Sequence, residues 1–302
     1  MKSIAKRVLL FLLLNAAVIL TVSLLLSFFD IRPYLSSAGL DYQSLLIFCL
    51  LWGFAGAFIS LGMSRLMAKW MMGVEVIDPD TTQPLERQLL ATIRQLVKRA
   101  GLPKMPEVGV YESEEVNAFA TGPTRSRALV AVSTGLLRKM DWTEIEGVLG
   151  HEVTHIANGD MVTMTLLQGV VNAFVMFFAR VLAYAVTSMT RQRESDSRSP
   201  FLYNVLVFAF EIVFMILGAI VVATYSRARE YRADEGGARL AGKQAMIQAL
   251  TRLQEVVKIE DPRSQHASFQ ALKISNPRGM LRLFSTHPPL EDRIARLQGK
   301  SV

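Results

Sequence analysis

Four long apolar blocks constrain this chain more than any other feature of its sequence. They cover residues 8–29, 44–63, 161–189 and 201–224. Each is long enough to cross the hydrocarbon core of a bilayer as a single helix. Hydrophobic residues make up 51% of the 302 positions, and they are concentrated in these blocks. The sequence therefore predicts an α-helical membrane protein with about four transmembrane helices.

Basic residues flank the first two blocks and predict the orientation of the chain. Lys2, Lys6 and Arg7 precede the first block, and Arg65 and Lys69 follow the second. The short link between the two blocks is slightly acidic. Cytoplasmic flanks of membrane spans carry an excess of Lys and Arg, so both outer flanks are expected in the cytoplasm. The first block does not end in small residues, which favours an uncleaved anchor over a signal peptide.

The third and fourth blocks each contain one charged residue near the middle, Arg180 and Glu211. Both residues are about equally far from the middle of the connecting loop. In an antiparallel hairpin they would lie at the same depth and form an intramembrane ion pair. The alternative is that Arg180 reaches the interface and the hairpin enters the bilayer only partly. Arg191 and Arg193 in the connecting loop fit that alternative better than a loop outside the cell.

The remaining, less apolar segments predict one cytoplasmic α+β domain. It would be formed by residues 65–160 and 226–302, with the hairpin of residues 161–225 inserted between them. Residues 1–64 would form the N-terminal membrane hairpin.

Hydrophobic periodicity predicts the elements of this domain. Helices are expected at residues 84–100 and 244–257 and after Pro289, strands at Glu107–Tyr111 and residues 128–132, and an edge strand at residues 117–122. A helix break is expected near Gly236 and Gly237.

The segment His151-Glu152-Val153-Thr154-His155 predicts a metal site on a helix. Two histidines four residues apart lie on one helical face, where both can bind one Zn²⁺. Glu152 lies beside them and can act as general base toward the attacking water. Asp141 and Glu144 predict a capping box at the start of this helix, and Gly159 predicts its end.

A catalytic zinc usually has three protein ligands. Cys49 is the only cysteine and lies in an apolar block, so the third ligand must be a carboxylate or another histidine. Glu230 is the strongest candidate, because Asp234 lies one turn further on and can accept the free N–H of a ligating histidine. Glu235 and Asp160 are weaker alternatives.

Taken together, HEVTHIANGD, SRAREYRADEGGARLAG, STHPPLEDRIARL and NAFATG resemble the HtpX family of bacterial heat-shock membrane metalloproteases. The resemblance covers nearly the full length. It implies that the cytoplasmic α+β domain is a zincin-like metalloprotease domain, a gluzincin-type endopeptidase with one Zn²⁺ per chain. His151, His155 and Glu230 would be the zinc ligands, Glu152 the catalytic base and Asp234 the residue that supports a ligating histidine.

The resemblance also implies where the protein works and on what. It implies quality control of misfolded or damaged membrane proteins in the bacterial inner membrane, with the active site on the cytoplasmic side and a membrane AAA protease as partner. Peptides, membrane proteins and the lipid bilayer are the expected binding partners. The net charge of +7 would also suit nucleic acid, but no basic stretch interleaved with aromatic residues is present.

One histidine and one possible edge strand are candidates for contact with the substrate. His287 is a candidate oxyanion donor or substrate-positioning residue, and residues 117–121 are a candidate edge for strand addition by an extended substrate.

Two other functions are alternatives to this one. A CAAX-type prenyl-peptide endopeptidase shares the zinc motif, but it has more spans than four blocks allow. A zinc-bound membrane scaffold or chaperone is the non-enzymatic alternative. An intact Glu152 and only three evident ligands argue against it.

Overall fold

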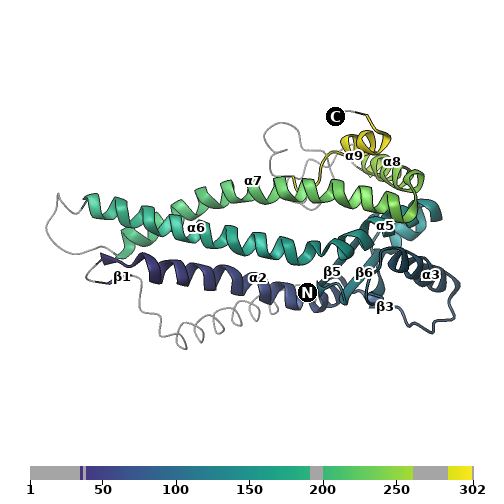
Figure 1. Cartoon of the computed structure of the whole chain (residues 1–302), viewed down its shortest axis with the longest axis horizontal. Coiled ribbons are helices and arrows are strands. Elements are labelled where there is room, and N and C mark those ends of the chain that lie inside the picture. The colour runs from purple at the N-terminus through teal and green to yellow at the C-terminus, as the bar shows by residue number, and fades with distance from the viewer. Residues whose placement is uncertain (1–34, 37–38, 191–199, 261–284, 301–302) are drawn as a thin grey trace. The chain divides into compact units, whose positions relative to one another are not determined.

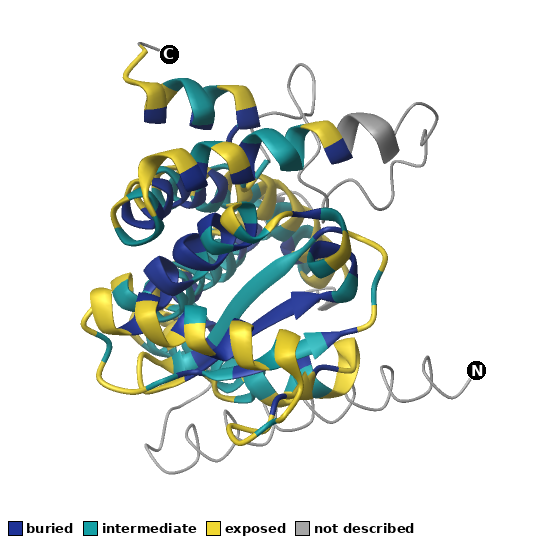
Figure 2. Ribbon diagram, turned by 90° about the vertical axis from the view of Figure 1, so that its right-hand side faces the viewer, coloured by how far each residue is buried: buried dark blue, intermediate teal, exposed yellow. Residues whose placement is uncertain are grey.

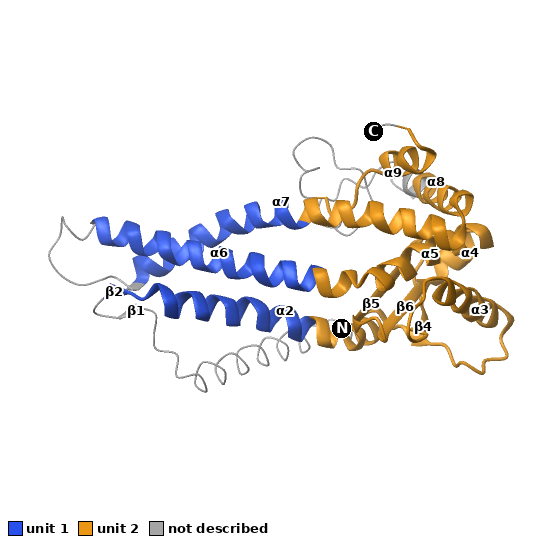
Figure 3. Cartoon of the chain, viewed as in Figure 1, with its two compact units in different colours: residues 1–60, 164–222 blue, residues 61–163, 223–302 orange. Residues whose placement is uncertain are grey.

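The computed structural model describes residues 35–36, 39–190, 200–260 and 285–300 (Figure 1). The predicted span at residues 8–29 and the arginines of the second hairpin loop lie outside the described residues. The chain divides into two compact units (Figure 3). Unit 1 comprises Met1–Ser60 and Met164–Val222, and unit 2 comprises Leu61–Thr163 and Ala223–Val302.

Three described helices are long and apolar enough to cross a membrane: α2 (Tyr42–Met72), α6 (Asp160–Thr190) and α7 (Pro200–Ala241). They contain the second, third and fourth apolar blocks, so the prediction of helices there is confirmed. Unit 1 holds one part of each. It also holds a small antiparallel pair of strands, β1 (Leu35–Ser36) and β2 (Gly39–Leu40).

The predicted ion pair of the second hairpin is present in unit 1. The Nη1 atom of Arg180 lies 2.7 Å from Oε1 of Glu211. The same nitrogen donates to the carbonyl oxygen of Met176, and the guanidinium lies 5.7 Å from the ring centre of Phe48. A charge that is costly in an apolar environment is thus paired with an opposite charge.

Small residues allow α2 and α6 to pack closely within unit 1. A Cβ atom on Gly53 would lie only 2.7 Å from the carbonyl oxygen of Gly169. Ala173, one turn further along α6, is buried in a cluster with Leu45 and Cys49. Close backbone approach at small residues is a usual basis of helix association in membranes.

Unit 2 contains a four-stranded sheet in the order β3-β4-β6-β5. The strands are β3 (Glu75–Val76), β4 (Glu107–Tyr111), β5 (Ala118–Thr124) and β6 (Arg127–Ser133). β4 and β6 are parallel, and β5 pairs with β6 in antiparallel register through Phe119 opposite Ala131. β6 is buried along most of its length (Figure 2). β5 lies at the edge of the sheet, as predicted.

Helices that pack on this sheet or on one another bury the core of unit 2. They are α3 (Pro84–Arg99), α4 (Thr134–Lys139), α5 (Trp142–Asn158), α8 (Lys243–Glu260) and α9 (Leu290–Gln298). Leu89 and Ile93 of α3 and Ile145 and Leu149 of α5 are almost fully buried in one cluster with β6. The predicted helices and strands of unit 2 are confirmed to within a few residues.

The predicted helix break near Gly236 and Gly237 is wrong, because α7 continues to Ala241. A Cβ atom on Gly236 would lie 2.2 Å from Cγ2 of Thr154, and one on Gly237 would lie 3.0 Å from the backbone nitrogen of His151. A helical glycine costs about 1 kcal/mol relative to alanine. In α7 the two glycines allow close contact with α5 instead of ending the helix.

Candidate metal centre

Helix α5 presents the two histidines of the HExxH segment from a well-defined start and end. Asp141 accepts a hydrogen bond from the Glu144 backbone, and the Glu144 side chain accepts one from the Asp141 backbone, which completes the predicted capping box. Gly159 ends the helix in the left-handed conformation, with φ of 71°. His151 and His155 are buried, so the helix holds both rings in a rigid environment.

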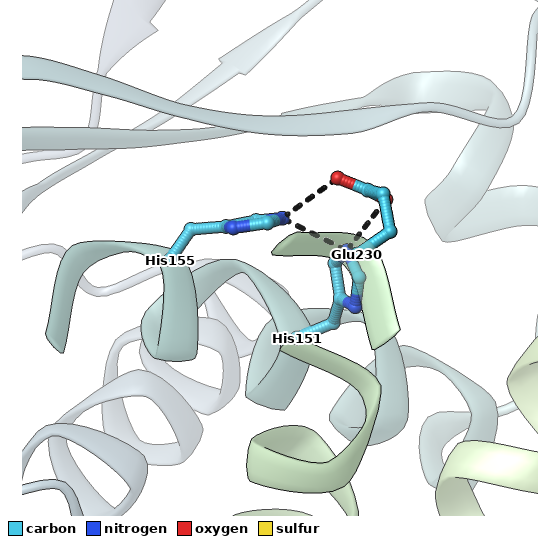
Figure 4. A group of neighbouring side chains, drawn as sticks. All are labelled: His151, His155 and Glu230. Carbon is cyan, nitrogen blue, oxygen red and sulfur yellow. Dashed lines mark hydrogen bonds and ion pairs between the residues drawn. The ribbon is translucent and has the colours of Figure 1, made fainter. Parts of the chain in front are cut away.

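Helix α7 brings Glu230 to the same point, and the three predicted ligands form one cluster (Figure 4). The Nε2 atoms of His151 and His155 lie 3.1 Å apart. Each lies 3.4 Å from a carboxylate oxygen of Glu230, whose side chain is 1% exposed. Two donor atoms that bind one tetrahedral ion at about 2 Å are about 3.3 Å apart. The three donors therefore fit a zinc-sized ion.

A second carboxylate orients each histidine through its other ring nitrogen. Oδ1 of Asp234 lies 2.9 Å from Nδ1 of His151, and Oδ2 of Asp160 lies 2.6 Å from Nδ1 of His155. A carboxylate on Nδ1 favours the tautomer that leaves Nε2 free to bind a metal. Asp234 thus makes the predicted contact. Asp160 is an alternative ligand in the sequence analysis, but in the structure it contacts Nδ1 of His155, the ring nitrogen that faces away from the donor cluster.

The remaining sequence candidates have different positions. Glu152 lines the same pocket as His151, His155 and Glu230. His287 also lines this pocket, with Nδ1 2.9 Å from Oε2 of Glu230. Glu235 is exposed and pairs with Arg296, so it is not part of the cluster.

Sequence reasoning missed two arginines near the cluster. Arg293 of α9 is 4% exposed and makes two hydrogen bonds to Asp234. Arg229 lines the pocket and donates to Glu230 at 3.0 Å. Arg293 could have been noticed, because it lies on the apolar face of its helix together with Leu290 and Leu297. Arg229 carries no such signal among its neighbours.

The charges around the cluster favour a divalent cation. Four carboxylates and two guanidiniums line the pocket or contact its histidines. They belong to Glu152, Asp160, Glu230 and Asp234 and to Arg229 and Arg293. Together these six groups carry a net charge of minus two. Burial opposes protonation of His151, but hydrogen bonds to Asp234 and Glu230 outweigh it and raise the pKa of His151 to about 10. This carboxylate environment stabilises positive charge at the centre of the cluster.

The pocket beside the cluster is large enough for part of a peptide. Its volume is about 290 Å³. Residues of the edge strand β5 form one wall, and apolar residues of α8 form another. A cluster of metal-binding donors, an adjacent carboxylate and an edge strand together make up the parts of a metallopeptidase site.

Comparisons with known proteins agree with this chemistry. Residues 83–301 match the model of peptidase family M48. The chain is 52% identical to an HtpX protease homologue of Bacillus licheniformis, with 98% of this chain and 99% of the relative covered. It is 48% identical to an HtpX protease homologue of Bacillus subtilis, with 98% and 100% covered.

A solved structure has the same fold. The crystal structure of S. mikatae Ste24p superposes with a TM-score of 0.66 at 17% identity, over 98% of this chain. This chain spans 65% of that longer protein. Its apolar helices and its relatives make it an integral membrane protein. The chain belongs to peptidase family M48, among the HtpX-type membrane metalloproteases.

Proposed function

We propose that this metalloprotease is a zinc endopeptidase of the bacterial inner membrane, with its active site on the cytoplasmic side, that degrades misfolded or damaged membrane proteins. The observation that carries the proposal is the convergence of His151, His155 and Glu230 beside Glu152 in one pocket. Three protein donors that leave room for a further ligand are typical of a catalytic zinc.

In the proposed reaction, His151, His155 and Glu230 would hold the zinc. When bound, zinc would polarise the substrate carbonyl and lower the pKa of the attacking water. Glu152 takes a proton from that water and passes it to the leaving amine of the substrate. His287, which lines the pocket, positions the substrate or donates to the developing oxyanion.

The substrate is proposed to bind as an extended strand along β5. Asn117, Ala118, Phe119 and Ala120 line the pocket, and β5 is an edge strand of the sheet. An edge strand offers backbone donors and acceptors to an added strand. Such pairing depends little on sequence, which suits an enzyme that recognises unfolded segments of many membrane proteins.

The membrane arrangement is part of the proposal. Three described helices can span, and residues 8–29 are apolar enough for a fourth. Two membrane hairpins, residues 1–64 and 161–225, would connect a catalytic domain built from residues 65–160 and 226–302. The basic flanks argue for a cytoplasmic domain. A membrane AAA protease is the proposed partner, and co-purification from membranes tests it.

The test is a cleavage assay on the full chain purified in detergent. We expect zinc-loaded wild type to cleave itself and an unfolded membrane-protein substrate, and to stop when a chelator removes the zinc. Glu152→Ala should be stable under the same conditions. Wild type that binds zinc but cleaves neither substrate would contradict the proposal. A strong preference for a prenylated peptide over the same unmodified peptide would show that prenylated peptides, and not misfolded membrane proteins, are the substrates.

A further inference from the structure

The C-terminal helix α9 places one charged residue inside unit 2. Leu290, Arg293 and Leu297 form its buried face, which packs in a cluster with Met246 and Leu250 of α8. An arginine on the buried face of a helix loses most of its hydration and needs strong partners. The partners of Arg293 therefore indicate why it is there.

The main partner of Arg293 is the carboxylate that contacts His151, and its Nη1 atom also lies 3.8 Å from Oε2 of Glu230. Nε of Arg293 donates to Oδ2 of Asp234 at 2.8 Å, and Nη2 donates to Oδ1 at 2.6 Å. Asp234 is 2% exposed. Two parallel hydrogen bonds between a guanidinium and a carboxylate fix the plane of the carboxylate as well as its position.

That fixed carboxylate in turn contacts a metal-binding ring. Oδ1 of Asp234 lies 2.9 Å from Nδ1 of His151, while Nη2 of Arg293 lies 3.4 Å from the same nitrogen. Arginine has no acceptor, so the Nδ1–H of His151 can donate only to Asp234. The arginine thus acts on the histidine through the aspartate.

We propose that Arg293 is a positioning residue of the metal centre, which locks Asp234 so that His151 keeps its Nδ1–H tautomer and presents Nε2 to the metal. The proposal rests on the zinc site described above. Its consequence is that α9 contributes to metal affinity although none of its side chains belongs to the three-residue donor cluster.

Without Arg293 the Asp234 carboxylate would be buried with one hydrogen-bond partner fewer. It could then rotate away from His151, which would release the histidine ring. Loss of a group that orients a ligand typically lowers metal affinity 10- to 100-fold. Since Arg293 acts on His151 through Asp234 and lies no closer than 3.8 Å to Glu230, we expect about a tenfold effect.

Arg296 provides a matched control on the same helix. It lies 3.2 Å from Glu235 of α7, the residue that follows Asp234, and over the ring of Tyr231 at 4.8 Å. Both side chains of this ion pair are about half exposed. Arg296 therefore joins the same two helices as Arg293 with the same kind of ion pair, but it does not contact the metal cluster.

The experiment measures zinc dissociation constants of the full chain in detergent by competition with a chromophoric chelator. Arg293→Met should bind zinc about tenfold more weakly than wild type, and Arg293→Lys should recover part of the loss. Arg296→Met should stay within about twofold of wild type. Arg293→Met should have little further effect in an Asp234→Asn background, because both changes remove the same contact.

A purely structural role is tested with Leu297→Ala, which removes packing from the same helix. This variant should lower the unfolding temperature without weakening zinc binding. Equal zinc affinity of Arg293→Met and wild type, or an equal loss in Leu297→Ala, would overturn the inference. If Arg293→Met does not fold, the zinc affinities of Arg293→Lys and Leu297→Ala are compared instead. Weaker binding in Arg293→Lys alone supports the inference, and equal affinities overturn it. Failure of wild type itself to bind zinc would count against the proposed function instead.

Discussion

Asp160 lies 2.6 Å from Nδ1 of His155, five residues earlier in the chain, across the turn that joins α5 to α6. The left-handed Gly159 between them makes this contact possible, because it ends α5 and starts α6 at Asp160. Asp160 and Asp234 thus contact the two histidines in the same way from two different helices.

Asp160→Asn is expected to weaken zinc binding 10- to 100-fold, because an amide orients the ring less strongly than a carboxylate. The measurement is the zinc dissociation constant by chelator competition. Glu235→Gln is the control, since Glu235 is exposed and outside the cluster. Asp160→Asn with the affinity of wild type would show that this contact does not orient His155.

Glu152→Gln is expected to lower the rate of peptide cleavage by at least about 10²-fold, because the amide cannot take a proton from water. Zinc content, measured by mass spectrometry of the purified protein, should stay at one ion per chain. Retained activity in this variant would mean that another group is the base. Loss of zinc would mean that Glu152 binds the metal.

Gly236→Ala is expected to destabilise the protein by about 1–3 kcal/mol, because the added methyl group would lie 2.2 Å from Cγ2 of Thr154. Thr154 cannot easily turn away, since its hydroxyl donates to the carbonyl oxygen of Gly150 at 2.8 Å. The measurement is thermal or denaturant unfolding of the protein in detergent. It should be accompanied by weaker zinc binding, because Glu230 lies on the same helix.

Gly62→Ala is the matched control for this prediction. Gly62 is also helical, but no described atom lies within 4 Å of an added Cβ. Alanine there should be neutral or stabilising by up to about 1 kcal/mol. Similar stability changes in the two variants would contradict the close contact between α5 and α7.

Arg180→Ala and Glu211→Ala should show coupling in a double-mutant cycle. The pair is 2.7 Å apart and mostly buried, so a coupling energy of about 1 kcal/mol is expected. Unfolding in a mild detergent would give the four stabilities of the cycle. Additive effects of the two substitutions would rule out a stabilising ion pair in this hairpin.

Glu107 should make stability dependent on pH. Burial opposes its charged form, but Lys69 and Arg65 outweigh it and lower the pKa of its carboxyl. A carboxyl whose pKa is lower in the folded state stabilises the fold above its unfolded value, about 4.3, and this contribution is lost as the pH falls through the folded-state value. Wild type and Glu107→Gln should therefore differ in unfolding temperature at pH 7, and the difference should shrink as the pH falls below about 4.3. A constant difference across this range would exclude the ion pairs as its cause.

Local patterns predicted much of the fold and of the candidate site. The i, i+4 spacings of His151 with His155 and of Glu230 with Asp234 place each pair on one helical face, so the four residues could be chosen from sequence. The capping box at Asp141 and the edge position of β5 also follow from local sequence. These features depend on neighbours in the chain or on one sheet edge.

The sequence predicted less well where the outcome depends on contacts between distant segments. Gly236 and Gly237 indicated a helix end, because the glycine penalty is local while the contact with Thr154 and His151 is not. The sequence leaves Asp160 as a possible ligand. Its contact with Nδ1 of His155 depends on the left-handed conformation of Gly159, which the sequence does not give. Arg293 is 142 residues from His151 in the chain, so no spacing rule connects them.

That separation has a consequence during synthesis of the chain on the ribosome. A ribosome that adds about 5–20 residues per second needs roughly 7–28 s to proceed from His151 to Arg293. Glu230 and Asp234 are added within this interval, whereas the guanidinium that fixes Asp234 is absent until its end. We therefore expect a nascent chain that has not yet reached Arg293 to bind zinc about as weakly as Arg293→Met.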